Sequence, residues 1–496
     1  RPEGAMPPKA KEKAKKAEVD KLSQQVLDER EGLAGGGLLE GLLKLKDVLV
    51  NLEPRICFWV LFAFALLFGS LTSVTLVLLC SFFAVWSSYR CSPRPEGIPL
   101  APPGLDVLLG RTIDVSKHVD ALHANNNVSI TAFGDRYILA YRNSDTHWPS
   151  GKTSLIVVSS KDLYTWKEEW RFANGCDLRE MLLFELGGKL MLYYFSLLPA
   201  NNAFHPLHVY CTTSSDASKW AEPREVCRKG EVPWDIKVRD LGQGPVAFKA
   251  SYVGDHYGAG DMLTLFEQSK DGFTWEPVGK SESAVVYRGG VCEVAFEFTA
   301  NGDLVALGRN EDGDETGFGT QLFFASKDDL GTWSKFRVSV PWRFDSPRMV
   351  RSAATGDILL FARYTPNRFQ LAPKWLQFVH QKVVNLVLYN LLPKSAAIYR
   401  IAPPEEWKGH TGGAGVKAVQ LVRFFERAFG DTGFFSLAPE LSAPAAPAAG
   451  DAGGDCWVVA NYVSTTCHSH APWIIGQTSP TAVQICRCRV VPEGKA

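Results

Sequence analysis

Acidic and basic side chains occur inside several runs of the sequence that otherwise have the composition of buried strands. They are Asp177 and Arg179 in CDLREM, Asp235, Lys237 and Arg239 in WDIKVRD, Glu293 in GGVCEVAFEF, Asp345 and Arg348 in FDSPRM, and Asp431 in GDTGFF. The ends of the strand-like runs that follow add Arg142, His256, Tyr257, Arg309, Glu311, Arg363, Asn461 and Tyr462. Arginines bind carboxylates or sugar hydroxyls through planar two-point contacts, and two carboxyl groups can supply the acid and base of glycosidic cleavage. If these runs converge, they predict a sugar-binding pocket; the alternative is that the charges pair with one another and hydrate a channel.

The elements that must bring these residues together are repeated strand pairs. Four similar turns, SKDLYTW, SSDASKW, SKDGFTW and SKDDLGTW, end at Trp166, Trp220, Trp275 and Trp333. Each turn follows two runs with alternating apolar and polar residues, and two further pairs of runs lack the turn, which makes six units over residues 119–491. Such alternation with Gly and Asp punctuation is typical of antiparallel strands, and each unit is long enough for four of them. Six four-stranded sheets bury their faces when they stand around a central channel, so the sequence predicts an all-β fold, a six-bladed β-propeller.

The repeated turn itself is predicted to be structural. Its aspartate can accept hydrogen bonds from backbone N–H groups of the turn, and Gly272 supplies a positive φ without a steric clash. We expect the closing tryptophan to cover the joint between two blades. The aspartates of these turns are therefore not candidates for catalysis.

The four turns resemble the Asp-box of the sialidase superfamily, whose members are six-bladed β-propellers. The strings RNEDGDETGFG, FDSPRM and IGQTSPT are similar to those of uncharacterised sialidase-like proteins. The resemblance covers residues 119–491 and implies a site at one mouth of the channel, opposite the Asp-boxes. Propellers with Asp-boxes also include proteins without catalytic activity.

This resemblance implies roles for individual residues. Sialidases use three arginines for the carboxylate of the sugar, a tyrosine nucleophile supported by a glutamate, and an aspartate as acid and base. By blade position, Tyr462 with Glu293 resembles the nucleophile pair, and Asp145 in NSDTHW resembles the acid. The predicted catalytic residues are thus Glu293, Tyr462 and Asp145. The predicted substrate-binding residues are Arg142, Asp177, Arg179, Arg239, Arg309, Glu311, Arg348 and Arg363, of which Arg309, Arg348 and Arg363 resemble the arginine triad. The family's N-terminal F/Y-R-I-P string is absent, and Arg142 could cover part of its role.

These assignments favour a membrane-anchored, exo-acting glycoside hydrolase that binds and hydrolyses terminal sugars of glycans. The alternative is a non-catalytic propeller that serves as a glycan-binding or scaffold subunit of a membrane complex. A glycosyltransferase is disfavoured because no alternation of strands and helices appears. No cofactor and no metal are expected, since the chain has no CxxC pair and NEDGD lacks the ligand spacing of a calcium loop. A net charge of zero, from 53 basic and 53 acidic residues, does not favour a nucleic-acid partner.

The N-terminal part of the chain predicts a membrane tether. Its segments are a charged tail at 1–37 that we expect to be disordered, an amphipathic helix at 38–54, a transmembrane segment at 56–87 and a linker at 88–118. Residues 56–86 contain no charged side chain, and about 20 apolar residues suffice to cross a bilayer. One tilted span is favoured over a tight hairpin, and the flanking basic residues lean toward a cytosolic N-terminus. This orientation would make the propeller lumenal or extracellular, in the endomembrane system or at the cell surface.

Two insertions interrupt the regular units, at 366–395 and 438–455. Residues 374–394 have helical length and apolar side chains around most of the circumference, which predicts packing, with a protein partner or the membrane as alternatives. Residues 438–455 have a low-complexity, Ala- and Pro-rich composition that predicts a disordered loop.

Overall fold

A computed structural model describes the propeller region of the chain. The described residues are 98–492 apart from 104, 198–207, 241, 243, 255–260, 315–316, 339–341, 367–393, 411–414, 430, 442–454 and 466–472. The predictions for 1–37, 38–54, 56–87 and 374–393, for most of 438–455, and for His256 and Tyr257 lie outside them. Within the described part, no helix has both the length and the apolar character needed to cross a membrane.

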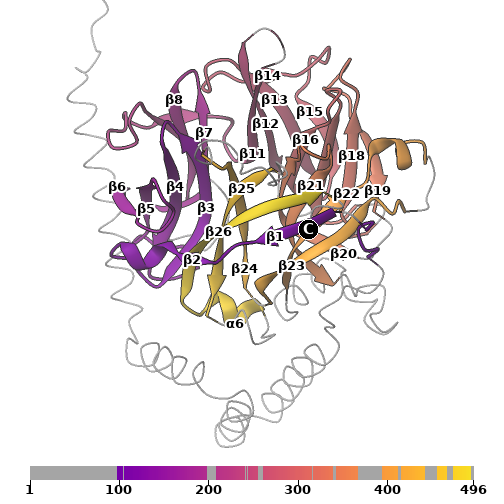
Figure 1. Cartoon of the computed structure of the whole chain (residues 1–496). Coiled ribbons are helices and arrows are strands. Elements are labelled where there is room, and N and C mark those ends of the chain that lie inside the picture. The colour runs from indigo at the N-terminus through magenta and orange to yellow at the C-terminus, as the bar shows by residue number, and fades with distance from the viewer. Residues whose placement is uncertain are drawn as a thin grey trace, which may run out of the picture. The chain divides into compact units, whose positions relative to one another are not determined.

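The described residues form six antiparallel sheets that stand around a common centre (Figure 1). The first blade is β3 (Ala124–Phe133), β4 (Arg136–Ser144), β5 (Ser154–Ser160) and β6 (Lys167–Phe172). The second is β7 (Asp177–Leu186), β8 (Lys189–Leu197), β9 (His208–Ser214) and β10 (Arg224–Val226). The third is β11 (Val232–Asp240), β12 (Pro245–Gly254), β13 (Met262–Ser269) and β14 (Glu276–Pro277), with β15 (Val285–Gly289) also paired to β13. The fourth is β16 (Val291–Phe298), β17 (Leu304–Asn310), β18 (Gln321–Ala325) and β19 (Ser334–Arg337). The fifth is β20 (Trp342–Arg351), β21 (Ile358–Pro366), β22 (Ser395–Ile401) and β23 (Val419–Phe429), and the sixth contains β24 (Thr432–Pro439), β25 (Cys456–Ser464) and β26 (Thr481–Pro492). Short helical turns are η1 (Val115–His118), η5 (Pro404–Glu406) and α6 (Trp473–Gln477).

The ring is closed by residues that the sequence analysis had assigned to a linker. Strand β1 (Leu105–Leu109) pairs with β26 along its whole length, and β2 (Ile113–Asp114) pairs with the same strand. The sixth blade therefore takes its outermost strand from the start of the propeller and its inner strands from the end. The linker assignment for 88–118 is wrong for residues 105–114, because this pairing depends on a partner more than 370 residues away and leaves no local signal.

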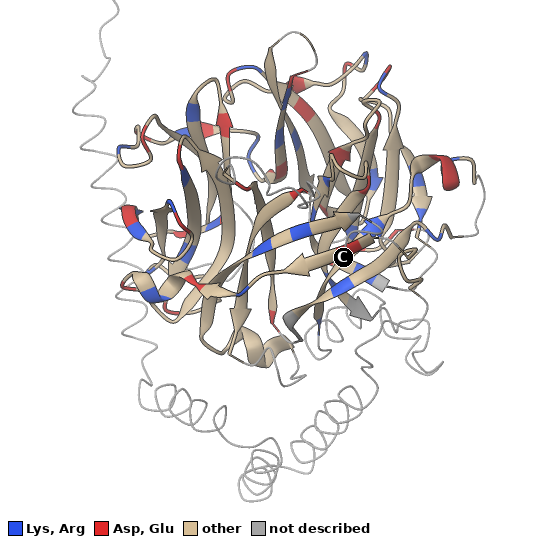
Figure 2. Cartoon of the chain, viewed as in Figure 1, with Lys and Arg blue, Asp and Glu red and all other residues tan. Residues whose placement is uncertain are grey.

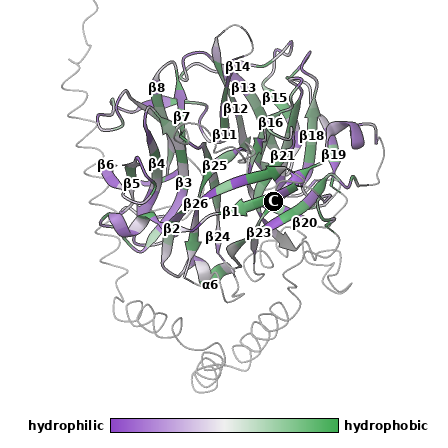
Figure 3. Cartoon of the chain, in the orientation of Figure 1, coloured by the Kyte–Doolittle hydropathy of each residue, from purple (hydrophilic) through white to green (hydrophobic). Residues whose placement is uncertain are grey.

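Apolar residues are frequent along the strands of the blades (Figure 3). The described residues form six clusters of buried apolar side chains, each containing residues of two adjacent blades. The tryptophans that close the four repeated turns, Trp166, Trp220, Trp275 and Trp333, each pack in one of these clusters. The predicted role of these tryptophans is confirmed.

The repeated turns have the predicted hydrogen bonding. The Asp162 carboxylate accepts bonds from the backbone N–H groups of Tyr164 and Thr165, each at 2.8 Å. These bonds, led by that from Thr165, lower the pKa of Asp162 to about 2. Gly272 occupies the equivalent of Leu163 with φ +71°, in the left-handed region that favours glycine. The aspartates of the repeated turns thus stabilise the backbone of those turns.

The innermost strands β3, β7, β11, β16, β20 and β24 run in the same direction around the channel. Hydrogen bonds join neighbouring inner strands at equivalent heights, for example from Leu183 N to Ser129 Oγ and from Phe296 N to Asp235 Oδ2. We call the end where these strands begin the strand-start end. They finish at the end that carries the repeated turns, which we call the repeated-turn end, since Ser160 at the end of β5 pairs with Tyr137 near the start of β4.

A ring of β-bulges interrupts all six inner strands near the strand-start end. The register shifts lie between Asn126 and Ser129, Arg179 and Leu182, Pro233 and Asp235, Val291 and Val294, Asp345 and Arg348, and Gly433 and Ser436. In four of them a residue other than glycine has a φ of 50–52°: Asn127, Glu180, Ser346 and Phe434. A bulge changes the direction of a side chain relative to the regular alternation of a strand, and a left-handed conformation strains residues other than glycine. Both features are common at functional sites.

Candidate functional site

Charged residues lie along the strands as well as in the connecting loops (Figure 2), and at the strand-start end they form buried ion-pair networks. The first network joins blades one and two. Asp177 on β7 accepts from Arg142 Nε at 2.8 Å, from Arg179 Nε at 2.6 Å and from Thr153 Oγ1 at 2.8 Å. Arg142 is fully buried, and its remaining nitrogens donate to the carbonyl oxygens of Thr146 and Trp148. The predicted residues Arg142, Asp177 and Arg179 therefore lie together, but their charged groups bind one another.

The second network centres on Arg309 of β17 in blade four. Its guanidinium pairs with Glu293 at 2.6 Å, with Asp345 at 2.8 Å and with Glu311. The second carboxylate oxygen of Glu293 accepts the backbone N–H of Ser346 at 2.6 Å, so both oxygens of Glu293 are engaged. This network again unites predicted residues, and it occupies the arginine that a ligand carboxylate would need.

Tyr462 on β25 meets a different carboxylate from the predicted one. Its hydroxyl donates to Asp431 Oδ1 at 2.5 Å and accepts from Arg363 Nη1 at 3.2 Å. Gln477 of α6 donates to the other oxygen of Asp431 at 2.7 Å. Burial raises the pKa of Asp431 to about 6, against the opposing charge of Arg363. The prediction that Glu293 supports Tyr462 is wrong in this structure: the partner is Asp431, just before β24 of the same blade, whereas Glu293 is held by Arg309.

Asp145, the predicted acid, lies in the loop between β4 and β5. It accepts from Ser150 Oγ at 2.6 Å and lies 3.6 Å from the Lys152 ammonium, with 39% of its side chain exposed. Its electric field reaches Arg142, which places it at the strand-start end, beside the first network. Asp145 is the most exposed of the three predicted catalytic residues, since Tyr462 is fully buried and Glu293 is 6% exposed.

The structure adds Glu180, which the sequence analysis missed. Glu180 sits on the bulge of β7 with φ 50°, and its Oε1 accepts a hydrogen bond from Asn127 Nδ2 at 3.0 Å. Burial, and then the charge of Glu293, raise the pKa of Glu180 to about 7, although Arg179 and Arg348 oppose the shift. In a regular strand, Glu180 would point to the opposite side of the sheet from Arg179, but the bulge removes that alternation. The sequence signal for Glu180 was therefore only the presence of a glutamate in CDLREM.

Buried polar atoms without a hydrogen-bond partner occur in the bulges of β3 and β20. In the described part of the chain, Asn126 Oδ1, Asn127 Oδ1 and Ser346 Oγ are buried and unpaired. His147 is also close, with Nδ1 2.9 Å from Asn126 Nδ2, and burial keeps its pKa well below the usual range. Unpaired buried polar groups are costly unless a ligand or water satisfies them, so this arrangement suits a ligand with several hydroxyl groups.

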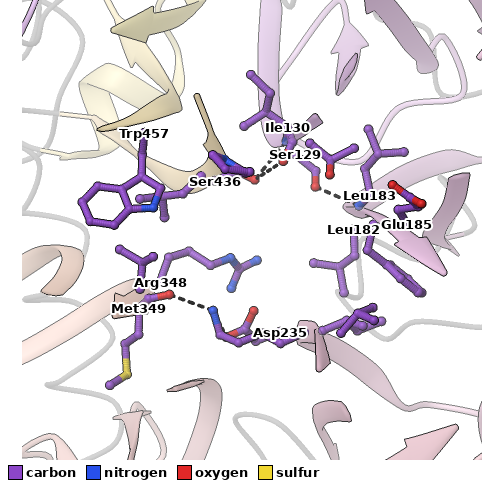
Figure 4. A pocket seen from close by; sticks show the side chains of 18 of the residues that line it. Ser129, Ile130, Leu182, Leu183, Glu185, Asp235, Arg348, Met349, Ser436 and Trp457 are labelled. Atoms are coloured by element: carbon purple, nitrogen blue, oxygen red, sulfur yellow. Dashed lines mark hydrogen bonds and ion pairs between the residues drawn. The ribbon is translucent and has the colours of Figure 1, made fainter. Parts of the chain in front are cut away.

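Two predicted binding residues lie in the other half of the channel. Arg239, near the end of β11, pairs with Glu297 at 2.5 Å, and 40% of its side chain is exposed. Arg348, after the bulge of β20, lies over the Trp234 ring with its guanidinium carbon 4.6 Å from the ring centroid. Both line a cavity of about 450 Å³ (Figure 4) formed by the second halves of the inner strands. The expectation that all candidates share one mouth is wrong, because charges within one inner strand are spread along the channel.

In the described part of the chain, no group of three or more His, Cys, Asp and Glu side chains is placed to hold a metal ion. The side chains described above at the strand-start end are carboxyl groups, a tyrosine, a histidine and arginines.

Comparisons with known proteins agree with the architecture. No protein-family model and no curated protein sequence matches the chain. Among solved structures, a protein of unknown function from Dyadobacter fermentans aligns with a TM-score of 0.51 and 14% identity, over 79% of this chain and 100% of that one. The sialidase of Trypanosoma rangeli bound to sialic acid aligns with a TM-score of 0.45 and 12% identity, over 79% of this chain and 60% of the sialidase. A family 117 glycoside hydrolase from Zobellia galactanivorans aligns over 47% of this chain and 75% of its own, with a TM-score of 0.33 and 13% identity. The fold is a six-bladed β-propeller. At these identities the likeness concerns the fold alone.

Proposed function

We propose that this propeller binds terminal sugars of glycans at the strand-start end of its channel and hydrolyses them. The observation that carries the proposal is Glu180, a carboxyl group on the bulge of β7 that Asn127 contacts and whose pKa burial raises to about 7, near Glu293, which pairs with Arg309. Carboxyl groups whose surroundings push their protonation states apart are typical of glycoside hydrolysis. At neutral pH a large share of Glu180 is protonated and could donate its proton to the leaving oxygen.

The nucleophile in this proposal is Tyr462. Its proton already points to Asp431 at 2.5 Å, and Arg363 at 3.2 Å would stabilise the phenolate that forms when Asp431 accepts the proton. Attack on the anomeric carbon would join the sugar to the tyrosine oxygen while Glu180 protonates the departing oxygen. Water would then release the sugar, with Glu180 taking a proton from that water.

The two ion-pair networks also indicate which charge the sugar should have. Arg142 and Arg309 are already paired with carboxylates, so a sugar carboxylate would have to displace them. The unpaired amide and hydroxyl oxygens in the bulges of β3 and β20 suit sugar hydroxyls instead. We therefore favour a neutral sugar over an acidic one. The tether at 56–87 and the lumenal or extracellular position of the propeller remain part of the proposal, as does a protein partner at 374–394.

A second candidate is a non-catalytic glycan-binding or scaffold propeller. Tyr462 favours it, because its side chain is fully buried and its hydroxyl already bonds to both Asp431 and Arg363. A nucleophile must reach the substrate, whereas a structural tyrosine need not.

The test is hydrolysis of a panel of neutral and acidic 4-methylumbelliferyl glycosides by the full-length chain. We expect Glu180→Gln and Tyr462→Phe to lower kcat/KM by about 10²–10⁴-fold, the usual contribution of a general acid or nucleophile. The matched controls Glu276→Gln and Tyr164→Phe, both on exposed side chains, should retain activity. Activity should fall above about pH 7, as Glu180 loses its proton, and below about pH 6, as Asp431 gains one.

The outcomes separate the two candidates. Activity that survives both substitutions would refute the assigned roles. Glycan binding without hydrolysis of any substrate would favour the second candidate, and the absence of both would refute the sugar-directed site.

A further inference from the structure

The lining of the cavity at the repeated-turn half of the channel includes none of Glu180, Asp431 and Tyr462. The cavity is lined by the later parts of β3, β7, β11, β20 and β24, together with Glu297 of β16 and Trp457 of β25. Its volume of about 450 Å³ lies in the range of small-molecule sites. Leu182, Met349 and Trp457 supply apolar wall, and the charged residues described next supply the polar groups.

Arg348 is the central feature of this cavity. It is 9% exposed, and Figure 4 shows its side chain extending into the open space between the strands. Its guanidinium lies over Trp234, and Nη1 donates to the carbonyl of Pro347 at 3.2 Å. Among the described residues no carboxylate oxygen lies within 4 Å of it, although Asp235, Glu180 and Glu293 act on it from farther away. A buried arginine normally has a close anionic partner, so this one is poised to bind an anion.

The neighbouring charges are mostly satisfied. Lys237 and Arg239 share Glu297, at 3.4 and 2.5 Å, and Lys237 is 4.0 Å from Asp235. Arg351 is a second cation without a described ion pair, and its buried Nε has no hydrogen-bond partner.

The charges that line the cavity leave one positive charge in excess. The four cations are Lys237, Arg239, Arg348 and Arg351, and the three acids are Asp235, Glu185 and Glu297. A ligand with a single negative charge would therefore neutralise the cavity. A planar guanidinium held on an aromatic ring is also pre-organised for the two oxygens of a carboxylate.

We propose that this cavity binds a small organic monoanion, a carboxylate attached to an apolar group, with Arg348 as the principal anchor and Arg351 as a second positive group. The proposed anion contact does not require catalysis, although Glu180 and Glu293 act on Arg348 from farther than 4 Å. The carboxylate contacts Arg348, and the apolar group packs against Trp457, Met349 and the leucine side chains of β7.

The test is calorimetric titration of the full-length chain with 4-phenylbutyrate, its neutral analogue 4-phenylbutanamide and inorganic phosphate. We expect the carboxylate to bind at least about tenfold more tightly than the amide, which corresponds to about 1.4 kcal/mol. Arg348→Met keeps an unbranched apolar side chain but removes the charge, so it should abolish this difference. Arg288→Met makes the same change at a side chain that is 66% exposed and outside the cavity, and it should leave the difference intact.

Three results would overturn the proposal: equal affinity for the carboxylate and the amide, phosphate binding as tightly as the carboxylate, or full carboxylate affinity in folded Arg348→Met. If Arg348→Met does not fold, Arg351→Met carries the test and should weaken carboxylate binding about threefold or more; unchanged affinity in that variant would also overturn it.

Discussion

Substitution of Asp177 by asparagine should strongly destabilise the propeller. The Asp177 side chain is fully buried and accepts bonds from two arginines, at 2.8 and 2.6 Å, of which Arg142 is also fully buried. Asparagine keeps the shape but removes the negative charge, so two buried guanidinium groups lose their anion. Removal of one partner from a buried ion pair costs about 3–5 kcal/mol.

This loss of free energy converts to a shift in Tm. The entropy of unfolding is about 2.1 cal/mol/K per residue, so a propeller of roughly 390 residues has an unfolding entropy of about 0.8 kcal/mol/K. Tm should therefore fall by about 4–6 °C.

The assay is thermal and urea unfolding followed by tryptophan fluorescence. Asp135→Asn is the matched control, because Asp135 pairs with Lys161 at 2.5 Å while 71% and 68% of the two side chains are exposed. Exposed pairs contribute little, so the control should unfold like the unmodified chain. Although burial opposes them, Arg179 and Arg142 hold the pKa of Asp177 below its usual value. The stabilisation is therefore present above about pH 4 and is lost as the pH falls through the lowered pKa. Equal stability of the two variants at pH 7 would refute the reasoning.

The remaining predictions concern a second buried charge and a repeated turn. Lys249 is fully buried between Glu231 at 2.6 Å and Glu267 at 3.0 Å, and among the described residues these two carboxylates otherwise share only the half-exposed Arg228. Lys249→Met removes the buried cation and should cost about 3–5 kcal/mol in urea unfolding; a loss below about 1 kcal/mol would contradict this. Gly272→Ala should lower stability by more than the roughly 1 kcal/mol expected for Gly134→Ala. Both glycines have positive φ, but a Cβ on Gly272 would lie 2.5 Å from the terminal methyl of Met191, which would have to shift inside a packed core cluster, whereas one on Gly134 meets no atom within 4 Å. Equal Tm values for these two variants would refute the steric argument.

The blade architecture could be predicted from sequence because its signals are local. Alternation of apolar residues within a strand and the turn residues between strands are set by neighbours a few positions away, and four turns carry the same pattern. Strand β1 was not predicted because it has no such local signal. Five residues, Leu105–Leu109, are a strand only because β26 offers an edge at the far end of the propeller sequence.

The candidate site was predicted in composition but not in pairing. The acids and arginines of the strand-start end do meet, as Asp177, Arg142 and Arg179 illustrate. Which carboxylate pairs with which arginine or tyrosine depends on the bulges and on the angular order of the blades. Neither can be read from the spacing of these residues in the sequence. Thus Tyr462 bonds to Asp431 in its own blade, and the bulge at Glu180 removes the alternation from which its direction would be inferred.

The two halves of the channel should select opposite ligand charges. At the strand-start end, a ligand carboxylate could bind Arg309 only by displacing Glu293, Asp345 or Glu311, and the displaced buried carboxylate would lose its bond to this guanidinium. That displacement costs several kcal/mol, more than one new ion pair returns. Arg348 requires no displacement, because no described carboxylate lies within 4 Å of it. An acidic ligand therefore gains most from the repeated-turn half, whereas a neutral sugar can satisfy the unpaired oxygens in the bulges of β3 and β20 without disturbing an ion pair. Substitution of Arg348 should accordingly affect binding of anions while leaving binding of neutral sugars unchanged.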